Sequence, residues 1–384
     1  MKKFLSLLLC FSLIMGITLN VSASQPSSSR KTVEYISQNW IESQLDHNAE
    51  VSETIRLYDT TDTLIGYLVS FERESEPAGY IVLSTEDGEY PIVEFSLDGE
   101  SIYAYLKDKF ETAKLSSASE TRAATTDKAL SSYSIVDDDI LYTDFINYSL
   151  KIKADSNELL FNQTGNLESF DTAKAKSTKS SPTADTFFND YIDFPSNSSG
   201  IDDVWSIPGA FIDALVMGDM PNVSSGEGNC GPTSLTNTVK LYAESRVNNQ
   251  DPLRDLKLNG SDNDTYNRLV QLSGYCASDA ASMSELLNAL KSYSSERGHS
   301  CSIDNYWLDL WGDFTRDLKA NKPILLYTSS SAGTAHAQVV VGYYLYKNGA
   351  QYLKIFSGWT SNATFVKFKP NSLNHFNGYC VKIT

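Results

Sequence analysis

Two residues in this chain stand in contexts that suit nucleophilic catalysis, and the first is Cys230. A glycine-rich loop, residues 226–229, precedes the cysteine, and Pro232 follows two positions later. A helix is predicted to begin there, because apolar residues recur at spacings of four and three at Leu235, Val239 and Tyr242, and proline is tolerated in a first helical turn. The positive end of that helix favours the thiolate over the thiol. Cys230 is therefore a candidate nucleophile, and the alternative interpretation is a small buried apolar residue.

The second residue is His336. It lies at the entry of an apolar run, residues 336–344, that is typical of a buried strand. A cysteine at a loop-to-helix junction, followed about a hundred residues later by a strand histidine, is the arrangement of a thiol hydrolase, in which the imidazole activates the sulfur. His299 and His375 occur in polar contexts and are interpreted as surface residues.

Composition excludes several classes of partner. The chain has 384 residues, of which 41% are hydrophobic, so it can bury a large core in more than one domain. Its net charge of −17 disfavours nucleic acid and anionic membrane surfaces as partners. We interpret the charge as a solvated acidic surface.

The first 23 residues are predicted to be a secretory signal peptide. Lys2 and Lys3 precede an apolar run, residues 4–21, and Val21-Ser22-Ala23 matches a cleavage site. A membrane anchor is the alternative, but polar residues follow at once without a basic stop-transfer flank. We therefore expect cleavage after Ala23 and a secreted, extracellular protein. No second apolar run is long enough to span a bilayer, so we expect no membrane span after signal cleavage.

The remaining cysteines do not indicate a metal site. They are Cys230, Cys276, Cys301 and Cys380, with no Cys-x-x-Cys spacing and no neighbouring histidine cluster. Their even number allows two disulfides, but a chain of this size does not require them. The sequence therefore predicts no metal or other cofactor.

Residues 24–155 are predicted to form a small α+β domain. A helix is expected over 31–45, and four strands rich in β-branched and aromatic residues are expected to form an antiparallel meander against it. The domain contains no catalytic constellation, and His47 lies in a polar turn. The four strands are expected at 55–58, 64–71, 79–83 and 90–95.

A linker is predicted over residues 156–186. Residues 172–181 contain no large apolar side chain, so they cannot join a core and would be open to proteolysis. Residues 115–132 have a similar composition and are also interpreted as a linker.

Residues 187–384 are predicted to form a second compact domain, with helices first and antiparallel strands afterwards. The polar run 259–264 resembles a calcium loop, but its ligand order is wrong, and a helix-capping turn is favoured. Ser282 and Glu285 fit a capping box at the start of another helix. Asn348-Gly349 between two apolar runs predicts a hairpin.

This order resembles the papain-like fold, with the nucleophile on the first helix and the histidine on the sheet. Asn229-Cys230-Gly231-Pro232-Thr233-Ser234 resembles the nucleophile motif of bacterial peptidases related to the bacteriocin-processing, C39-like proteases. The run from His336 to Tyr343 resembles their histidine motif, and Phe356-Ser357-Gly358-Trp359 resembles the strand that follows. The first domain is similar to the propeptide of streptopain-like proteases, through Leu57-Tyr58-Asp59 and the run from Ala78 to Ser84.

Two departures from the family pattern leave site residues open. The resemblance implies an Asn or Asp that orients the histidine, but its place holds Ser357, and no Asp or Glu follows Asp317. Asn362 and the Ser357 hydroxyl are the candidates. The resemblance also implies a glutamine before the cysteine that faces the oxyanion. It is missing here, which leaves the Cys230 N–H together with Ser224, Ser225 or Asn229.

These features predict a secreted cysteine peptidase that is made as a zymogen. Its expected partners are a peptide or protein substrate and its own propeptide, and its catalytic residues would be Cys230 and His336, assisted by Asn362 or Ser357. One alternative is another thiol acyl-transfer enzyme on the same fold, such as an amidase or a transglutaminase-like enzyme. The other is a binding module on a catalytically decayed scaffold.

Overall fold

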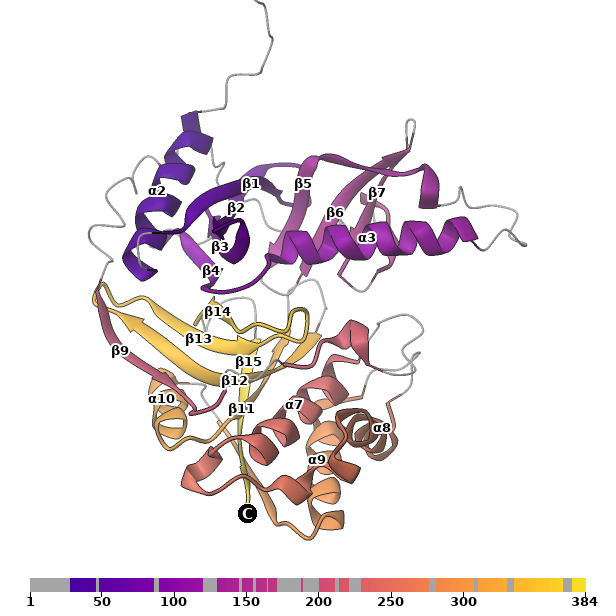
Figure 1. The fold of residues 1–384 in the computed structure, drawn as a ribbon, viewed down its shortest axis with the longest axis vertical. Coiled ribbons are helices and arrows are strands. Elements are labelled where there is room, and N and C mark those ends of the chain that lie inside the picture. Colours follow the sequence, from indigo (N-terminus) through magenta and orange to yellow (C-terminus); the bar gives the residue numbers. More distant parts are fainter. Residues whose placement is uncertain are drawn as a thin grey trace, which may run out of the picture.

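The computed structural model divides the described chain into two domains that are stacked on each other (Figure 1). The signal segment 1–23, His47, Cys276 and residues 171–187 lie outside the described residues. Among the described helices, none is long and apolar enough to cross a membrane. The described residues are 28–45, 48–85, 90–119, 130–144, 147–154, 157–163, 165–170, 188, 200–210, 214–220, 229–275, 281–306, 310–329, 335–368 and 375–384.

The first domain is a curved sheet with one helix at each end. α2 (Ser28–Gln44) turns Val33, Ile36 and Trp40 toward the sheet at helical spacing, and all three are buried. α3 (Ile102–Ser119) lies along the other half of the sheet (Figure 1). The strands are β1 (Glu50–Tyr58), β2 (Leu64–Arg73), β3 (Glu76–Ser84), β4 (Ile92–Ser96), β5 (Ser134–Asp144), β6 (Asn147–Ala154), β7 (Asn157–Asn162) and β8 (Leu167–Glu168).

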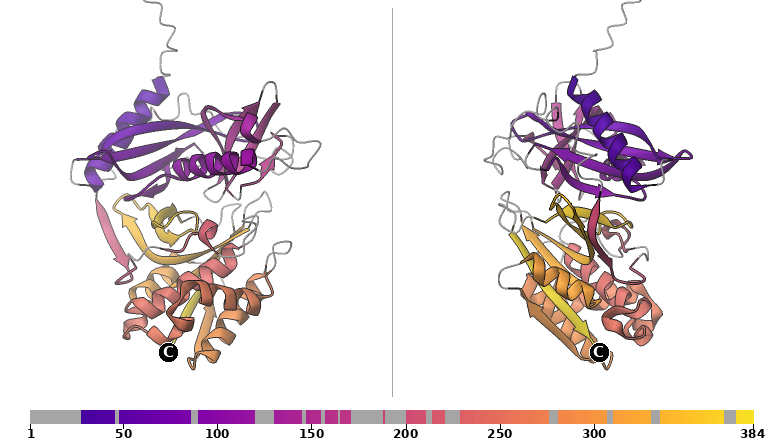
Figure 2. Two further views of the ribbon diagram at one scale, coloured as in Figure 1. Left: turned by 45° about the vertical axis from the view of Figure 1, so that its right-hand side comes forward. Right: turned by 90° about the vertical axis from the view of Figure 1, so that its left-hand side faces the viewer.

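The second domain has the predicted order of helices before antiparallel strands. The helices α7 (Cys230–Glu244), α8 (Asp262–Ser273) and α9 (Met283–Glu296) pack together, and α7 also packs on the sheet (Figure 2). α10 (Trp311–Lys319) precedes the central strands. The strands are β9 (Ile201–Ser206), β10 (Cys301–Asn305), β11 (Ile324–Ser329), β12 (Ala335–Tyr346), β13 (Gln351–Phe356), β14 (Thr364–Lys367) and β15 (His375–Ile383).

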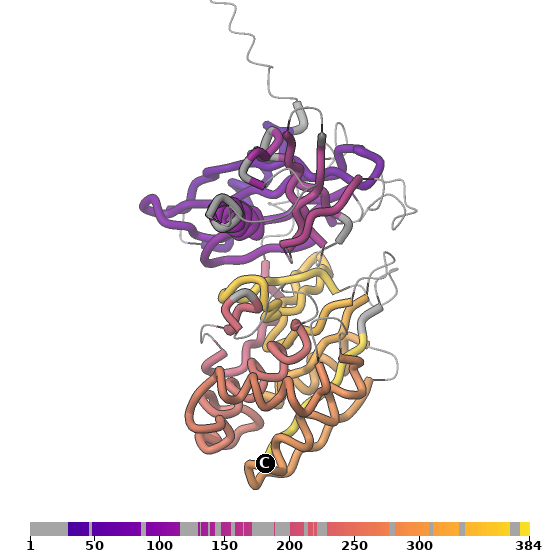
Figure 3. The backbone as a smooth tube through the Cα atoms, turned by 90° about the vertical axis from the view of Figure 1, so that its right-hand side faces the viewer, coloured from indigo at the N-terminus to yellow at the C-terminus, as the bar shows by residue number. Residues whose placement is uncertain are grey.

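The strands of both domains form one continuous sheet. The two halves join where β14 pairs antiparallel with β4, with Phe365 opposite Phe95 and Val366 opposite Glu94. The rings of Phe95 and Phe365 stack there with centroids 4.6 Å apart. Figure 3 shows the yellow strands of the second domain meeting the first domain at this interdomain interface. The strand order is β10-β15-β11-β12-β13-β14-β4-β3-β2-β1-β5-β6-β7-β8, with β9 beside β12.

Apolar packing also crosses the interdomain interface. One core belongs to the second domain alone and surrounds Leu235, Val239 and Val340. A second core joins α3 and its sheet to Met217 and Trp359 of the second domain. A third joins α2 and strands β2 to β4 to Tyr346, Tyr352 and Phe365. The two domains therefore share buried surface rather than sitting on a flexible tether.

Local sequence signals were confirmed where they were strong. Ser282 accepts a hydrogen bond from the Glu285 N–H and the Glu285 carboxylate accepts one in return, which completes the capping box of α9. Ser261 likewise caps α8 by accepting from Asp264 N, so run 259–264 is a capping turn. The hairpin turn places Gly349 at φ 87°.

The predicted linkers differ from the structure. β7 and β8 lie within 156–186, and β7 pairs with β6 along its whole length, so the first domain continues past residue 155. The described part of this domain reaches residue 170. The serine-rich residues 115–119 complete α3 and do not begin a linker, because the buried side chains of its first turns, Ile102, Leu106 and Phe110, anchor the helix to the sheet.

Candidate active site

Cys230 is the first residue of α7, as the sequence predicted. Its side chain is half-buried and contacts two apolar cores. Gly231 is required next to it, since a Cβ there would lie 2.7 Å from the methyl groups of Leu286. The main-chain N–H groups of Cys230 and Gly231 approach the sulfur, as expected at a helix N-terminus.

His336 lies at the start of β12, and its side chain is 3% exposed. The main-chain N–H of the next residue, Ala337, also lies within hydrogen-bonding reach of the Cys230 sulfur. The chain thus brings the start of α7 against the start of β12, although 105 residues separate them in sequence. The structure places the candidate nucleophile against the start of the strand that carries the candidate base.

The orientation of the His336 ring follows from one hydrogen bond. Nε2 lies 2.6 Å from the carbonyl oxygen of Ser357. Because a carbonyl oxygen only accepts, Nε2 must carry the hydrogen, and Nδ1 is left with the lone pair. Trp359 stacks on the ring with a centroid separation of 5.0 Å and an interplanar angle of 13°. This arrangement holds one tautomer, in which Nδ1 is the basic atom.

Burial keeps both reactive groups uncharged in this structure. It raises the pKa of the Cys230 thiol above its ordinary value, against the opposing effect of the surrounding main-chain N–H groups. It also lowers the pKa of His336 to about 4, despite the Ser357 carbonyl that favours the protonated ring. The sequence predicted that the helix end would favour a thiolate, but desolvation outweighs that effect here.

Ser357 and Asn362 occupy places other than those expected of a side chain that orients the histidine. Ser357 supplies its main-chain carbonyl to His336, while its hydroxyl accepts a hydrogen bond from Trp359 N at 3.3 Å. Asn362 packs against Gly99 of the first domain, so closely that a Cβ on Gly99 would lie 1.5 Å from Nδ2. The main chain therefore takes the role that the sequence assigned to one of two side chains.

Of the side chains proposed for the oxyanion site, only that of Asn229 lies among the described residues. Its side chain is fully buried, and Nδ2 donates to the carbonyl of Met217 at 2.9 Å. This Nδ2–H group is therefore already used in a hydrogen bond within the protein. Ser224 and Ser225 fall outside the described residues.

The first domain covers this site. Ile102, Tyr103 and Leu106 of α3 share a buried core with Met217 and Trp359, and the same core contacts Cys230. Trp359 is 8% exposed while it stacks on His336. The Trp359 indole therefore contacts both the candidate base and the apolar core of the first domain.

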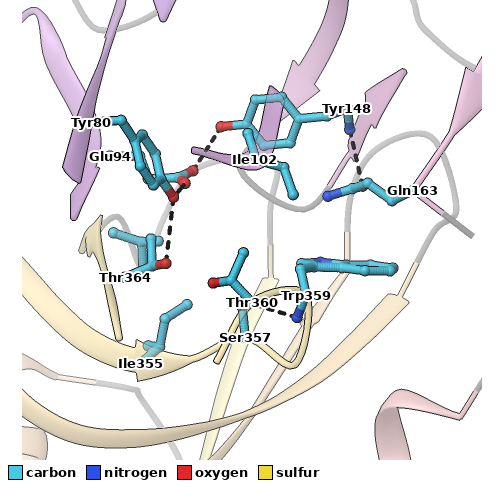
Figure 4. Close-up of a pocket in the computed structure, with 11 residues that line it drawn as sticks. Tyr80, Glu94, Ile102, Tyr148, Gln163, Ile355, Ser357, Trp359, Thr360 and Thr364 are labelled. Carbon is cyan, nitrogen blue, oxygen red and sulfur yellow. Dashed lines mark hydrogen bonds between the residues drawn. The ribbon is translucent and has the colours of Figure 1, made fainter. Parts of the chain in front are cut away.

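A polar cluster lies beside Trp359 at the same interface (Figure 4). The carboxylate of Glu94 accepts hydrogen bonds from Tyr80 at 2.5 Å and from Tyr148 at 2.7 Å. Burial and the neighbouring carboxylate raise the pKa values of both tyrosines well above their ordinary value. Ser357 and Trp359 line the same small cavity from the side of the second domain.

Sequence reasoning missed the roles of Met217, Gly358 and Trp359. Gly358 has a φ of 79° and a Cβ on it would come within 3.4 Å of the Met217 side chain, so the turn after Ser357 needs glycine. Gly358-Trp359 was noted only as part of a motif. The available signal in the sequence was a glycine between a predicted strand and an aromatic residue, because glycine permits a positive φ.

The fold and the site have the arrangement expected of the papain-like class, with a thiol at the start of a helix and an imidazole on an adjoining antiparallel sheet. Residues 218–364 match the model of the Peptidase_C39 like family, and this range includes Cys230 and His336. The match covers less than half of the chain, and it confirms the C39-like resemblance of the two motifs.

Among solved structures, the chain is similar to a mutant fragment of prointerpain A from Prevotella intermedia. The two chains are 13% identical, the TM-score is 0.29, and the alignment covers 82% of this chain and 94% of the other. A likeness of this size transfers no residue roles. No curated protein matches the chain.

Proposed function

We propose that this chain is a secreted cysteine peptidase, made as a zymogen, that hydrolyses peptide bonds with Cys230 and His336. The observation that carries the proposal is the tautomer of His336. A buried imidazole with its Nε2 hydrogen held by Ser357 O has a basic Nδ1, and the N–H of the neighbouring residue Ala337 reaches the Cys230 sulfur at the start of α7. That pairing is what nucleophilic catalysis by cysteine requires.

The chemistry follows from these two groups. Nδ1 takes the thiol proton, and the Cys230 thiolate attacks the carbonyl carbon of the peptide bond. The imidazolium returns that proton to the departing amine as the C–N bond breaks, which leaves a thioester. Water then attacks the thioester while Nδ1 takes its proton, the C–S bond breaks, and the thiol is restored. The Cys230 N–H at the helix start would turn from the sulfur to the oxyanion.

The zymogen part of the proposal rests on how the first domain covers the site. A substrate chain would need the space beside Cys230 and Trp359 that α3 and its sheet fill. Burial also raises the pKa of the Cys230 thiol and lowers that of His336, and both shifts disfavour the reactive ion pair. A tethered domain has an effective concentration of about a millimolar relative to its partner, and a cut in the tether removes that advantage.

We place the activating cut between residues 173 and 187, which are outside the described residues. The test uses a full-length chain in which residues within 173–185 are replaced by the recognition sequence of a site-specific protease. We expect little hydrolysis of a peptide substrate before the cut and a large increase after it. The Cys230→Ala form should be cut equally well and stay inactive.

Three results would contradict parts of this proposal. Equal activity before and after the cut would contradict the zymogen. Activity in Cys230→Ala would contradict the nucleophile. Labelling of Cys230 by an electrophilic peptide without peptide hydrolysis would favour the acyl-transfer alternative. Secretion predicts that the exported zymogen starts at Ser24, which N-terminal sequencing of the exported, uncut Cys230→Ala protein can check.

A further inference from the structure

One short stretch joins the helix that carries Cys230 to the turn that orients His336. We call Ala214–Met217 the bridge segment. On the helix side, Asn237 of α7 exchanges hydrogen bonds with both main-chain groups of Leu215, at 2.7 and 3.1 Å. On the sheet side, the N–H of Ala214 donates to Ser361 O at 3.0 Å. The bridge segment is therefore held from two directions.

The bridge segment completes an unbroken path between the two reactive residues. His336 Nε2 donates to Ser357 O at 2.6 Å, and the next residue, Gly358, accepts from Met217 N at 2.8 Å. The carbonyl of Met217 in turn accepts from Asn229 Nδ2 at 2.9 Å, and Asn229 is bonded to Cys230. Met217 and His336 are each 3% exposed and Asn229 is fully buried, so water does not compete for these bonds.

Asn229 sits where an asparagine would ordinarily cap its own helix. It is the N-cap residue of α7, yet its side chain makes no capping hydrogen bond. An asparagine in that role contributes about 1 kcal/mol to helix stability. Here the amide nitrogen instead donates to the Met217 carbonyl. The fold thus uses this side chain for a tertiary contact next to the nucleophile.

We propose that Asn229 is a positioning residue that, through Met217 and Gly358, fixes the Cys230 sulfur relative to the His336 ring. This inference rests on the proposed cysteine-peptidase function and adds a residue to that site. If the amide is lost, the start of α7 and the turn at 357–359 can shift independently. A misplacement of 1 Å at a reacting centre costs about a hundredfold in rate.

The test compares Asn229→Ala and Asn229→Leu in the full-length chain. The leucine variant keeps the size of the side chain and removes the donor. The first readout, taken after the linker is cut, is the rate at which iodoacetamide alkylates the peptide that carries Cys230, followed by mass spectrometry as a function of pH. The second is turnover after the linker is cut. We expect alkylation at neutral pH to fall about tenfold or more, and turnover to fall by ~10- to 100-fold with little change in KM.

Thr236→Val is the matched control. Thr236 is also fully buried on α7, and its hydroxyl donates to Pro232 O at 2.8 Å, away from the path. It should lower the melting temperature as much as the Asn229 variants do, without moving the alkylation profile. Wild-type alkylation in both Asn229 variants, or an equal shift in Thr236→Val, would overturn the proposal. Alkylation does not depend on peptide hydrolysis, so it decides the role of Asn229 even if the proposed activity fails.

Discussion

The residue that orients His336 does so with its main chain. The carbonyl of Ser357 carries no net charge, so it stabilises an imidazolium less than a carboxylate would. It also needs no acidic side chain, which is consistent with the absence of Asp and Glu after Asp317. The orienting group is therefore set by backbone geometry and not by the identity of one side chain.

This arrangement predicts how the two candidate side chains respond to mutation. Ser357→Ala keeps the carbonyl, so turnover of the cut enzyme should stay within about twofold of wild type. Asn362→Ala removes a contact with Gly99 and should ease release of the first domain without slowing turnover. Steady-state kinetics of the cut and uncut forms measure both effects. A large loss of turnover in Asn362→Ala would show that its amide orients His336 after the first domain has left.

The cysteine and the histidine could be identified from sequence because their signals are local. A glycine-rich loop, a first-turn proline and a helical repeat all surround Cys230, and a long apolar run surrounds His336. The partner of His336 and the role of Asn229 could not be identified in this way. Both depend on Met217 and Ser357, whose main-chain groups carry no sequence signature and become neighbours only when the chain folds.

At the scale of the elements, the turn between β13 and β14 carries the orienting carbonyl. Gly358 adopts a φ of 79°, and the space for a Cβ is bounded by Met217 and Thr233. The left-handed conformation costs a non-glycine residue about 1–2 kcal/mol. Any other residue at position 358 would therefore strain the turn that positions Ser357 O.

Gly358→Ala should accordingly lower both the melting temperature and turnover, because relief of the strain would move the Ser357 carbonyl away from Nε2. Calorimetry and single-turnover kinetics measure the two effects. Gly312→Ala is the control: this glycine lies in α10 with no atom near its Cβ position, and alanine favours a helix interior by roughly 0.5–1 kcal/mol. Unchanged turnover in Gly358→Ala would mean that this turn does not determine the orientation of the His336 ring.

Element boundaries were predictable where capping or alternation was strong and not elsewhere. The helices α8 and α9 have clear caps, and the meander β1 to β4 alternates with polar turns. α3 was missed although Ile102, Leu106 and Phe110 repeat at helical spacing, because its serine-rich end resembles a linker. β10 and β15 were missed because they depend on strand pairing that only the fold supplies: β10 pairs with β15, and β15 pairs with β11 on its other side.

At the scale of the whole molecule, the depressed pKa of His336 links the packing of the two domains to pH. The ring titrates near 4 in the packed form against an ordinary value of 6.5. Between pH 4 and pH 6.5, a form in which water reaches His336 has a protonated ring, whereas the packed form has a neutral one. The packed form is therefore fully favoured above pH 6.5 and loses stability as the pH falls toward 4. The raised Cys230 pKa acts only near and above pH 9, outside this window.

We thus expect the first domain to bind the linker-cut enzyme more weakly within this window than above it. Gel filtration of the cut Cys230→Ala protein across the pH range measures the association without proteolysis. His336→Gln removes the titrating group and should flatten the dependence. A pH dependence that survives in His336→Gln would assign it to other groups at the interface.

The continuous sheet also makes removal of the first domain hard to reverse. When the domains part, β4 and β14 each lose a partner and present a bare row of N–H and C=O groups. The freed first domain also exposes Phe95 and Tyr80, which are buried in the intact chain. Such an edge invites aggregation and digestion, and any loss of the freed domain draws the equilibrium further toward separation. A single cut would then be irreversible in practice, because the pairing of β4 with β14 cannot re-form once the freed domain is lost. Each first domain would inhibit its enzyme only until the cut.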